Sequence, residues 1–444
     1  MAEIVVLGSG MAGFGAASHL NAEAGLRPVV YEQSAYFGGH TASFRDKNGF
    51  LFDLGPHISF TKDPRIQDLL AKNVDQKYES VQINLNNYWR GHWITHPVQL
   101  HLNALPRDLI VDIIKDFVEE QHAPERPIAN YEDWLIASYG RKFAELFPMQ
   151  YTRKYHLTTA SNMSTDWLGP RMYRPSLEEV LKGALAPWKP ETHYISNFRY
   201  PTQDGFLSYL SSFPGIAELK LNHKLLSIDP KQKTLRFANG ATKEYSALVS
   251  SIALPDILPM IDGAPKDVIA ASQLLACSTC VLVNIGVDRN DLSESQMTYF
   301  YDEDISFTRL SFPHLLSATN VPQGCGSIQA EVYYSKKYRP LDHPPELCID
   351  RVIADLKKCG LLRETDRIMT RHARVIEYAN VIFDLDRSNA LATVHGYLQD
   401  VGIAYCGRYG DWGYMWTDES FISGERAAGA ALSTSPASAK RQSR

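Results

Sequence analysis

The fold of this chain is decided by Ile4-Val5-Val6-Leu7-Gly8-Ser9-Gly10-Met11-Ala12-Gly13. The apolar run at 4–7 predicts a buried strand, and the small residues at 16–20 predict a helix packed against it. Gly8 permits a tight turn, Gly10 lets a phosphate approach the backbone, and Gly13 allows close packing between helix and strand. The free N–H groups of the helix N-terminus then face the phosphates. This order of strand, glycine turn and helix predicts a dinucleotide-binding unit.

A second strand and an acid complete that unit. The run Pro28-Val29-Val30-Tyr31 ends on Glu32, whose carboxylate can accept hydrogen bonds from a ribose diol. A second glycine pair, Gly38-Gly39, follows, and then comes Gly49-Phe50-Leu51-Phe52-Asp53-Leu54-Gly55-Pro56-His57. An ordinary glycine-rich turn would not explain why an acid ends the second strand.

Bulk properties narrow the class of protein. A chain of 444 residues is long enough for a large core and two or three subdomains. Its 45 basic and 50 acidic residues give a net charge of −5, which does not support nucleic-acid binding. We find neither a secretory signal nor an apolar run long enough to span a membrane, so we expect a cytoplasmic protein. The sequence does not decide the oligomeric state, and a homodimer is compatible with it.

Two groups of metal-ligand residue types do not predict a metal site, and we expect none. Cys277 and Cys280 lead into a strand-like run and have no second pair at zinc spacing, so we interpret them as buried strand cysteines. The histidine group at 92, 96 and 101 lies in strand-like sequence. Residues 92 and 96 would lie about 13 Å apart on one face of a strand, too far to share one ion.

The hydrophobic period changes along the chain. Residues 64–195 predict mostly helices, including one from Tyr131 to Phe147 that Pro148 stops. After residue 219, short apolar runs separated by turns at 229–230 and 239–240 predict a β-meander, and a buried-type strand follows at 247–251. Residues 280–335 predict further strands. A strand that ends at Gly407, a helix from Asp418 through Leu432 and a disordered tail at 433–444 complete the expected order.

The glycine pair after the acid resembles the FAD-binding fingerprint of glutathione-reductase-type flavoproteins. The segment 49–57 is similar to the next segment in amine oxidases, protoporphyrinogen oxidases and UDP-galactopyranose mutases. The resemblance implies an α/β fold with a discontinuous Rossmann-like FAD-binding domain, a mainly helical substrate or lid domain and an antiparallel-sheet substrate domain. Their expected boundaries are 1–60, 200–265 and 375–444 for the first, 61–199 for the second and 266–374 for the third. The implied FAD-binding residues are Gly8, Gly10, Met11, Ala12, Gly13, Glu32, Gln33, Gly38, Gly39, Gly55, His57, Gly407, Arg408 and Asp418.

A series of short segments over nearly the whole chain resembles the UDP-galactopyranose mutases in particular. The series includes Gly55-Pro56-His57-Ile58, Tyr151-Thr152-Arg153-Lys154-Tyr155, Phe307-Thr308-Arg309 and Gly407-Arg408-Tyr409-Gly410. The resemblance implies conversion of a nucleotide-linked hexopyranose to its furanose form, through an adduct between the sugar and N5 of reduced FAD. Arginines would hold the diphosphate and tyrosines would position the sugar. The implied catalytic residues are His57, Arg174, Arg309, Tyr334 and Tyr378, and the implied substrate-binding residues are Tyr155, Arg171 and Tyr333.

The chain departs from the mutase pattern at Lys154-Tyr155-His156, where the mutases read Lys-Trp-Gly. A relative that acts on another nucleotide sugar, or on another small molecule, therefore stays open. The alternative class is an FAD-dependent oxidoreductase of the amine oxidase or protoporphyrinogen oxidase type, including desaturases, whose site would carry few arginines. A flavin-binding protein without catalytic activity is the third reading. Redox balance separates the first two, because a mutase needs reduced FAD but consumes none.

Overall fold

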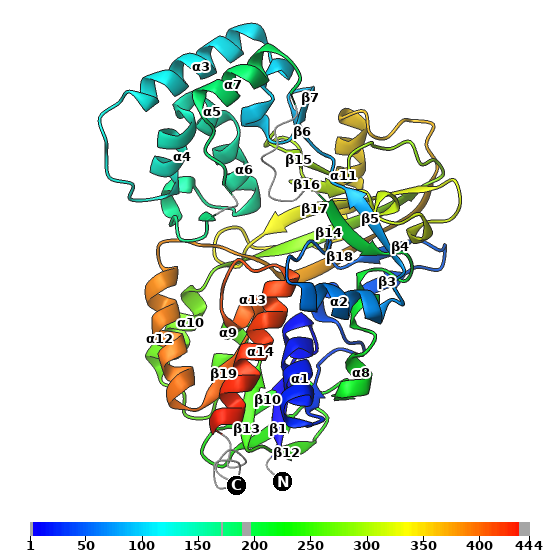
Figure 1. Cartoon of the computed structure of the whole chain (residues 1–444), viewed down its shortest axis with the longest axis vertical. Coiled ribbons are helices and arrows are strands. Elements are labelled where there is room, and N and C mark those ends of the chain that lie inside the picture. The colour runs from blue at the N-terminus through cyan, green and yellow to red at the C-terminus, as the bar shows by residue number, and fades with distance from the viewer. Residues whose placement is uncertain (1–2, 170–171, 189–196, 435–444) are drawn as a thin grey trace.

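The computed structural model describes residues 3–169, 172–188 and 197–434. Three parts follow one another along its longest axis (Figure 1). A parallel sheet with its helices lies at one end, a large mixed sheet lies in the middle, and a group of helices covers the other end. The first helix, α1 (Met11–Ala24), and the last helix, α14 (Thr417–Thr434), lie side by side at the end that holds the parallel sheet.

The parallel sheet is built around the first strand, β1 (Ile4–Leu7), which is completely buried. The strand order is β19-β13-β1-β2-β9, and all neighbours pair in parallel. The bounds of the other four strands are Val29–Tyr31 for β2, Ala247–Ser250 for β13, Ile403–Tyr405 for β19 and Glu218–Lys220 for β9. The sheet therefore joins strands that are far apart in the sequence. Three of them, β1, β2 and β13, lie at the strands predicted for 4–7, 28–31 and 247–251.

The predicted β-meander is confirmed. The strands β10 (Leu225–Asp229), β11 (Thr234–Phe237) and β12 (Thr242–Glu244) pair antiparallel in that order. The turns fall at the two predicted places, with Asp229 accepting the backbone N–H groups of Lys231 and Gln232, each at 2.9 Å. Gly240 has a φ of 84°, which a glycine adopts without strain.

Two helices pack against each other over the parallel sheet: α1 (Met11–Ala24) and α14 (Thr417–Thr434). Glycines allow this contact, because a Cβ at Gly15 would overlap the carbonyl oxygen of Phe421 and a Cβ at Gly424 would overlap that of Ala12. The last helix extends through Thr434, two residues beyond its expected end at Leu432, so Ser433 and Thr434 belong to the helix rather than to a tail. The rest of the expected disordered tail, 435–444, lies outside the described residues.

The large sheet has the order β18-β14-β17-β16-β15-β6-β7. Its neighbours pair antiparallel, except β15 and β6, which are parallel. The bounds are Ile368–Val381 (β18), Cys277–Val287 (β14), Gly326–Tyr334 (β17), Arg309–Ser311 (β16), Met297–Phe300 (β15), Leu85–Trp89 (β6) and His92–Thr95 (β7). The strands β6 and β7 come from the segment expected to be mostly helical. Their hairpin turns at Arg90 and Gly91, both with positive φ.

The helical group contains α3 (Arg107–Gln121), α4 (Tyr131–Tyr139), α5 (Arg141–Leu146), α6 (Pro148–Tyr155) and α7 (Leu177–Leu185). The single helix predicted from Tyr131 to Phe147 is wrong. The chain breaks at Gly140, where φ is 78° and a Cβ would lie 2.8 Å from the backbone nitrogen of Phe117 in α3. Pro148 begins a helix instead of only ending one, because proline at the first helical position needs no N–H partner.

The remaining elements connect these parts. They are β3 (Ser43–Arg45), β4 (Leu51–Asp53), α2 (Pro64–Asn73), β5 (Tyr78–Gln82), β8 (Asn197–Pro201), α8 (Phe213–Ile216), α9 (Leu254–Ile257), α10 (Lys266–Leu274), α11 (Leu347–Lys358), α12 (Arg387–Asp400) and α13 (Gly407–Gly410). The strands β3 and β4 pair antiparallel, and so do β5 and β8.

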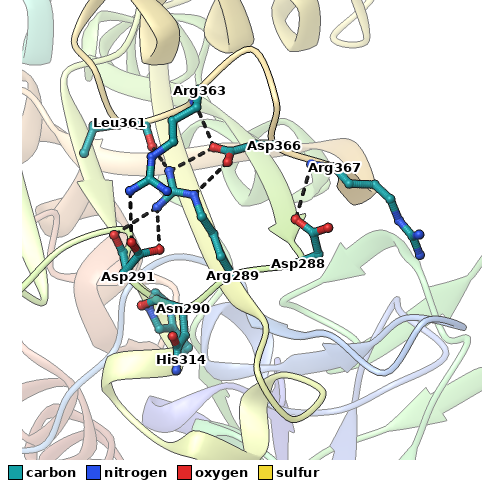
Figure 2. Close-up of polar contacts among 9 residues, drawn as sticks. All are labelled: Asp288, Arg289, Asn290, Asp291, His314, Leu361, Arg363, Asp366 and Arg367. Atoms are coloured by element: carbon teal, nitrogen blue, oxygen red, sulfur yellow. Dashed lines mark hydrogen bonds and ion pairs between the residues drawn. The ribbon is translucent and has the colours of Figure 1, made fainter.

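An ion-pair cluster fastens the end of β14 to the loop between α11 and β18 (Figure 2). Arg289 donates from Nε to Asp366 Oδ1 at 2.8 Å and from Nη2 to Oδ2 at 2.9 Å, which is a forked pair. Asp291 accepts Arg289 Nη1 at 2.8 Å and Arg363 Nη2 at 2.9 Å. The hydrogen bond from Arg289 lowers the pKa of Asp366. Two loops are therefore held together by charge-assisted bonds.

The cysteines match their expected place on a strand. Cys280 is buried in β14, and Cys277 Sγ lies 3.0 Å from the carbonyl oxygen of Asn380. All six cysteines lie within the described residues and are free. In the same residues, no group of three or more His, Cys, Asp or Glu side chains is arranged to hold a metal ion. No described helix combines the length and apolar character that crossing a membrane requires.

Candidate flavin and substrate site

The first glycine turn is shaped for a phosphate. Gly8 has a φ of 96°, and its N–H donates to the carbonyl oxygen of Tyr31 at 2.8 Å. Gly10 is the N-cap of helix α1, and within this described helix the first turn has no side-chain cap and no acidic residue. The first N–H groups of a 14-residue helix are thus left for a ligand. Met11 and Ala12, both buried, begin the helix.

The second glycine pair lies directly on this turn. Gly38 N–H donates to the carbonyl oxygen of Ser9 at 2.9 Å, and a Cβ at Gly39 would lie 3.1 Å from Gly10 Cα. Gly38 and Gly39 have φ values of 105° and 54°. Two glycine segments therefore meet backbone to backbone, and bulkier residues would fill this cradle. These residues fit the pyrophosphate of a dinucleotide.

Glu32 joins the second strand to the turn. Its Oε2 accepts Ser9 N–H at 3.0 Å and Ser9 Oγ–H at 2.8 Å, and its Oε1 accepts Ser34 N–H at 2.9 Å. The side chain is buried beside the turn, where a ribose would follow the phosphates. Gln33, the next predicted cofactor residue, is exposed.

The C-terminal segment comes to the same turn. A Cβ at Gly407 would lie 2.8 Å from Ala12 Cβ, and Gly407 N–H donates to Ser423 Oγ at 2.9 Å. Arg408 donates from Nε to the carbonyl oxygen of Met415 at 2.9 Å and from Nη1 to that of Ala379 at 3.2 Å. Arg408 thus braces this loop against β18. Asp418 lies in the first turn of α14 and is partly exposed.

Two histidines lie near Arg408 and are neutral. His57 Nδ1 is 2.9 Å from the carbonyl oxygen of Gly55, which only accepts, so Nδ1 carries the proton. Burial, together with the charges of Arg408 and Arg309 and against the hydrogen bond to Gly55, lowers the pKa of His57 to about 4. His40 Nδ1 lies 3.2 Å from the Tyr409 hydroxyl, and burial, then His57 and Arg408, lower its pKa to about 3.

An arginine–glutamate pair lies where β16 meets β17. Arg309 donates from Nε to Glu331 Oε1 at 3.0 Å and lies 2.9 Å from the same oxygen through Nη2. Glu331 also accepts the hydroxyl of Tyr333. Burial lowers the pKa of Arg309, but the Glu331 carboxylate and the neighbouring tyrosines together outweigh burial, so the pKa of Arg309 is raised. The arginine is therefore charged but paired.

Tyrosine rings surround this pair. Tyr155, at the end of α6, lies 4.9 Å from the ring of Tyr333 and stacks on Tyr151 at 5.3 Å. Tyr151 contacts Tyr299, the residue paired with Arg309 across β15 and β16, at 5.9 Å. Burial raises the pKa of Tyr155 and Tyr333, and Arg309 opposes the rise. The structure thus brings together Tyr155, Arg309 and Tyr333, and Arg309 and His57 interact electrostatically.

Other predicted site residues lie elsewhere. Tyr334 points to the opposite face of β17 from Tyr333, because successive strand residues alternate, and its hydroxyl lies 3.1 Å from His343 Nε2. Tyr378 donates to Asp256 Oδ1 at 2.6 Å, although its ring lies 5.8 Å from that of Tyr409. Arg174 is exposed and donates to the carbonyl oxygen of Ala137 at 2.8 Å. Arg171 lies outside the described residues.

Several site residues were missed in the sequence. Glu331 precedes Tyr333 by two positions, so strand alternation could have placed both on one face. Tyr151 and Lys154 lie in the segment 151–155, which resembles the mutases, but the sequence predicted no role for either side chain. Lys154 is buried and donates from Nζ to the carbonyl oxygens of Phe300 at 3.0 Å and Asp302 at 2.8 Å. Burial lowers the pKa of Lys154 to about 7.

The parallel sheet, the double glycine cradle and the acid define an FAD-binding flavoprotein of the amine oxidase-like superfamily. Its overall structure is similar to that of reduced UDP-galactopyranose mutase, with a TM-score of 0.89 and 25% identity over 97% of this chain and 94% of that one. A protoporphyrinogen oxidase-type protein from Exiguobacterium sp. 255-15 shares the fold, with a TM-score of 0.75 and 15% identity over 97% and 98% of the two chains.

Comparison with known sequences finds similarity over short parts of the chain. The family model of the NAD(P)-binding Rossmann-like domain matches residues 6–72. The 15-cis-phytoene desaturase of Narcissus pseudonarcissus is 34% identical over 90 residues, which are 20% of this chain and 14% of that protein. The chain thus spans only about a seventh of that curated relative. The predicted superfamily, the α/β fold and FAD as the cofactor are confirmed.

Proposed function

We propose that this protein is an FAD-dependent mutase that converts a nucleotide-linked hexopyranose to its furanose form. The observation that supports this most is the meeting of Tyr155, Arg309 and Tyr333, drawn from separate motifs, within a fold similar over its whole length to reduced UDP-galactopyranose mutase. Reduced FAD, when bound, would supply the nucleophile for the reaction.

The chain's own residues would bind and orient the substrate. Glu331 takes one side of the Arg309 guanidinium, and the N–H groups that Glu331 does not use would donate to a diphosphate oxygen. The rings of Tyr155 and Tyr333 would pack against the sugar. His57, with its proton on Nδ1, would offer Nε2 as a hydrogen-bond acceptor. The fixed positions of these groups would lower the entropic cost of reaching the reactive geometry.

The test is product formation by the holoenzyme. Dithionite-reduced protein is incubated anaerobically with UDP-galactose and a panel of other nucleotide sugars, and the products are separated by chromatography. We expect a furanose product, lowered about 100-fold in Arg309→Met. Thr242→Ser, in the distant β-meander, is the matched control and should retain the wild-type rate. If no sugar of the panel yields a furanose, the proposal is wrong for that substrate class.

A second candidate is an oxidoreductase that acts on an uncharged substrate, such as an amine in its neutral form or a polyene. The pairing of Arg309 with buried Glu331 and the exposed position of Arg174 favour it, because both reduce the positive charge available to a diphosphate. This activity would reduce bound FAD stoichiometrically. Bleaching of oxidised flavin by such a substrate under anaerobic conditions would support it, and an unchanged spectrum would contradict it.

The predicted domain boundaries, the cellular location and the binding partners of the protein are also part of this proposal. We propose a cytoplasmic protein that takes a small-molecule substrate and binds no nucleic acid. Light scattering of the purified holoenzyme measures whether it is a homodimer.

A further inference from the structure

His156, directly after α6, is a buried histidine with an unsatisfied polar atom. Its side chain is 4% exposed, and its Nδ1 has no hydrogen-bond partner among the described residues. Whether Nδ1 carries the proton or not, a donor or an acceptor is left unpaired there. An unpaired buried polar group destabilises a protein by about 1–3 kcal/mol, so such groups are rare and often functional.

The surroundings of His156 are aromatic and come from three separate parts of the chain. Its ring lies 4.9 Å from that of Tyr155 at an interplanar angle of 88°, and 5.6 Å from that of Trp167. Trp167 in turn lies 6.1 Å from Tyr414, in the C-terminal loop that Arg408 braces. The imidazole thus contacts rings from α6 and from the loop after it, and Trp167 links this group to the C-terminal loop.

The neutral state of His156 favours an uncharged ligand over an anion. Burial lowers the pKa of His156 to about 3, so the imidazole is neutral at physiological pH. Trp167 uses its Nε1–H on the carbonyl oxygen of Ser164 at 3.1 Å, so it offers its ring faces rather than a donor. Aromatic rings beside a neutral imidazole suit an uncharged ring that carries a hydroxyl group. Arg309, on the other side of Tyr155 and Tyr333, is the better ligand for a phosphate because its guanidinium is charged.

We propose that His156 is a specificity-determining residue that hydrogen-bonds a hydroxyl group of the hexose, with the Tyr155 and Trp167 rings against the sugar. This inference rests on the proposed function and adds the residue that reads the sugar. It also gives a physical reason for the departure from the mutase pattern at Lys154-Tyr155-His156: this chain places an imidazole beside the aromatic ring.

The test separates the sugar from the nucleotide. His156→Phe and His156→Asn are compared with wild type as dithionite-reduced holoenzymes, and UDP and UDP-galactose are titrated into each while the flavin spectrum is followed. We expect His156→Phe to weaken UDP-galactose about tenfold, which is the loss of about one hydrogen bond, and to leave UDP within about twofold. His156→Asn, which keeps a polar atom, should lie between. Exposed His122→Phe is the matched control and should bind both as wild type does.

Two results would overturn the inference: an equal loss for UDP and UDP-galactose, or no loss for either. Thermal unfolding gives an independent measurement, because removal of an unsatisfied polar atom predicts an equal or higher Tm for His156→Phe. A Tm lowered by several degrees would assign His156 to packing and contradict a ligand role. Failure of the proposed function is distinguishable from failure of this inference, because the wild-type protein itself would then neither bind UDP-galactose nor convert it. The sugar contact then fails with it.

Discussion

Adjacent tyrosines on β17 give the sharpest comparison between single residues. Tyr333 and Tyr334 differ by one position in the sequence, yet Tyr333 donates to Glu331 beside Arg309 and Tyr334 contacts His343 on the other face of the sheet. The residue type and the neighbouring motif did not distinguish them. Only the direction of the strand side chains assigns Tyr333 to the site.

This difference predicts opposite outcomes for the same substitution. Tyr333→Phe removes the hydroxyl that Glu331 accepts, so we expect turnover to fall about tenfold with the fold intact. Tyr334→Phe should change turnover less than about twofold. Steady-state kinetics of both variants checks this. Equal effects, or a larger effect of Tyr334→Phe, would mean that the assignment of the two faces is wrong.

His57 carries a prediction about pH. Burial lowers the pKa of His57 to about 4, whereas an unfolded histidine has a pKa of about 6.5. Between these values the unfolded chain binds more protons, so the free energy of unfolding falls as the pH drops from about 6.5 towards 4. We expect the imidazole signal that disappears in His57→Asn to show no titration between pH 5 and 7. A midpoint near pH 6.5 by NMR would contradict the buried, neutral state.

At the level of single residues, the glycines and Glu32 could be predicted because their roles depend on local chain geometry. His40 could not, since its importance comes from contacts with segments far away in the sequence, and the sequence signal for Glu331 was its position two residues before Tyr333 on one strand. Arg174 was implied by the resemblance to the mutases, and the structure places it at an exposed position of the helical part.

Among elements, the packing of α1 on α14 depends on glycine. A Cβ at Gly424 would overlap the carbonyl oxygen of Ala12, which is backbone and cannot move aside. We expect Gly424→Ala to destabilise the protein by about 2–3 kcal/mol and to lower FAD content, because α1 begins at the glycine turn. The matched variant is Gly396→Ala at an exposed position of α12, where nothing lies within 4 Å of the added Cβ. It should stabilise by about 0.5–1 kcal/mol. Denaturant unfolding measures both, and similar effects would contradict the close contact.

The Arg289–Asp366 pair joins two loops and predicts an acid sensitivity. Since the folded pKa of Asp366 is lowered, its contribution is present above the unfolded pKa and is lost as the pH falls through the folded pKa. Asp366→Asn should therefore lower the free energy of unfolding by about 1–3 kcal/mol at pH 7 and less at pH 3. Urea titrations at both pH values check this. The same loss at both would show that the ion pair does not contribute.

Elements with local signals were predictable, and those set by distant contacts were not. The β-meander followed from its turn residues, and its pairing agrees with them. The break at Gly140 depends on the approach of α3, which the helical periodicity of 131–147 does not reveal. Likewise β6 joins the large sheet by pairing in parallel with β15, more than two hundred positions later in the chain.

For the whole molecule, the proposed mutase function, which the similarity to reduced UDP-galactopyranose mutase supports, amounts to one claim: FAD would act here in reduced form without being consumed. The large sheet and the helical group place Arg309, Tyr155 and His156 on elements separate from the dinucleotide cradle. Substrate recognition and cofactor binding should therefore be separable by mutation.

The most direct test of this claim counts turnovers against electrons. Dithionite-reduced holoenzyme, freed of excess reductant, is mixed anaerobically with UDP-galactose while flavin absorbance is recorded and the furanose is quantified from the same sample. We predict many furanose molecules per flavin, with the flavin still fully reduced at the end. Oxidation of one flavin per product formed, or no furanose with turnover of an amine or polyene instead, would contradict the mutase account.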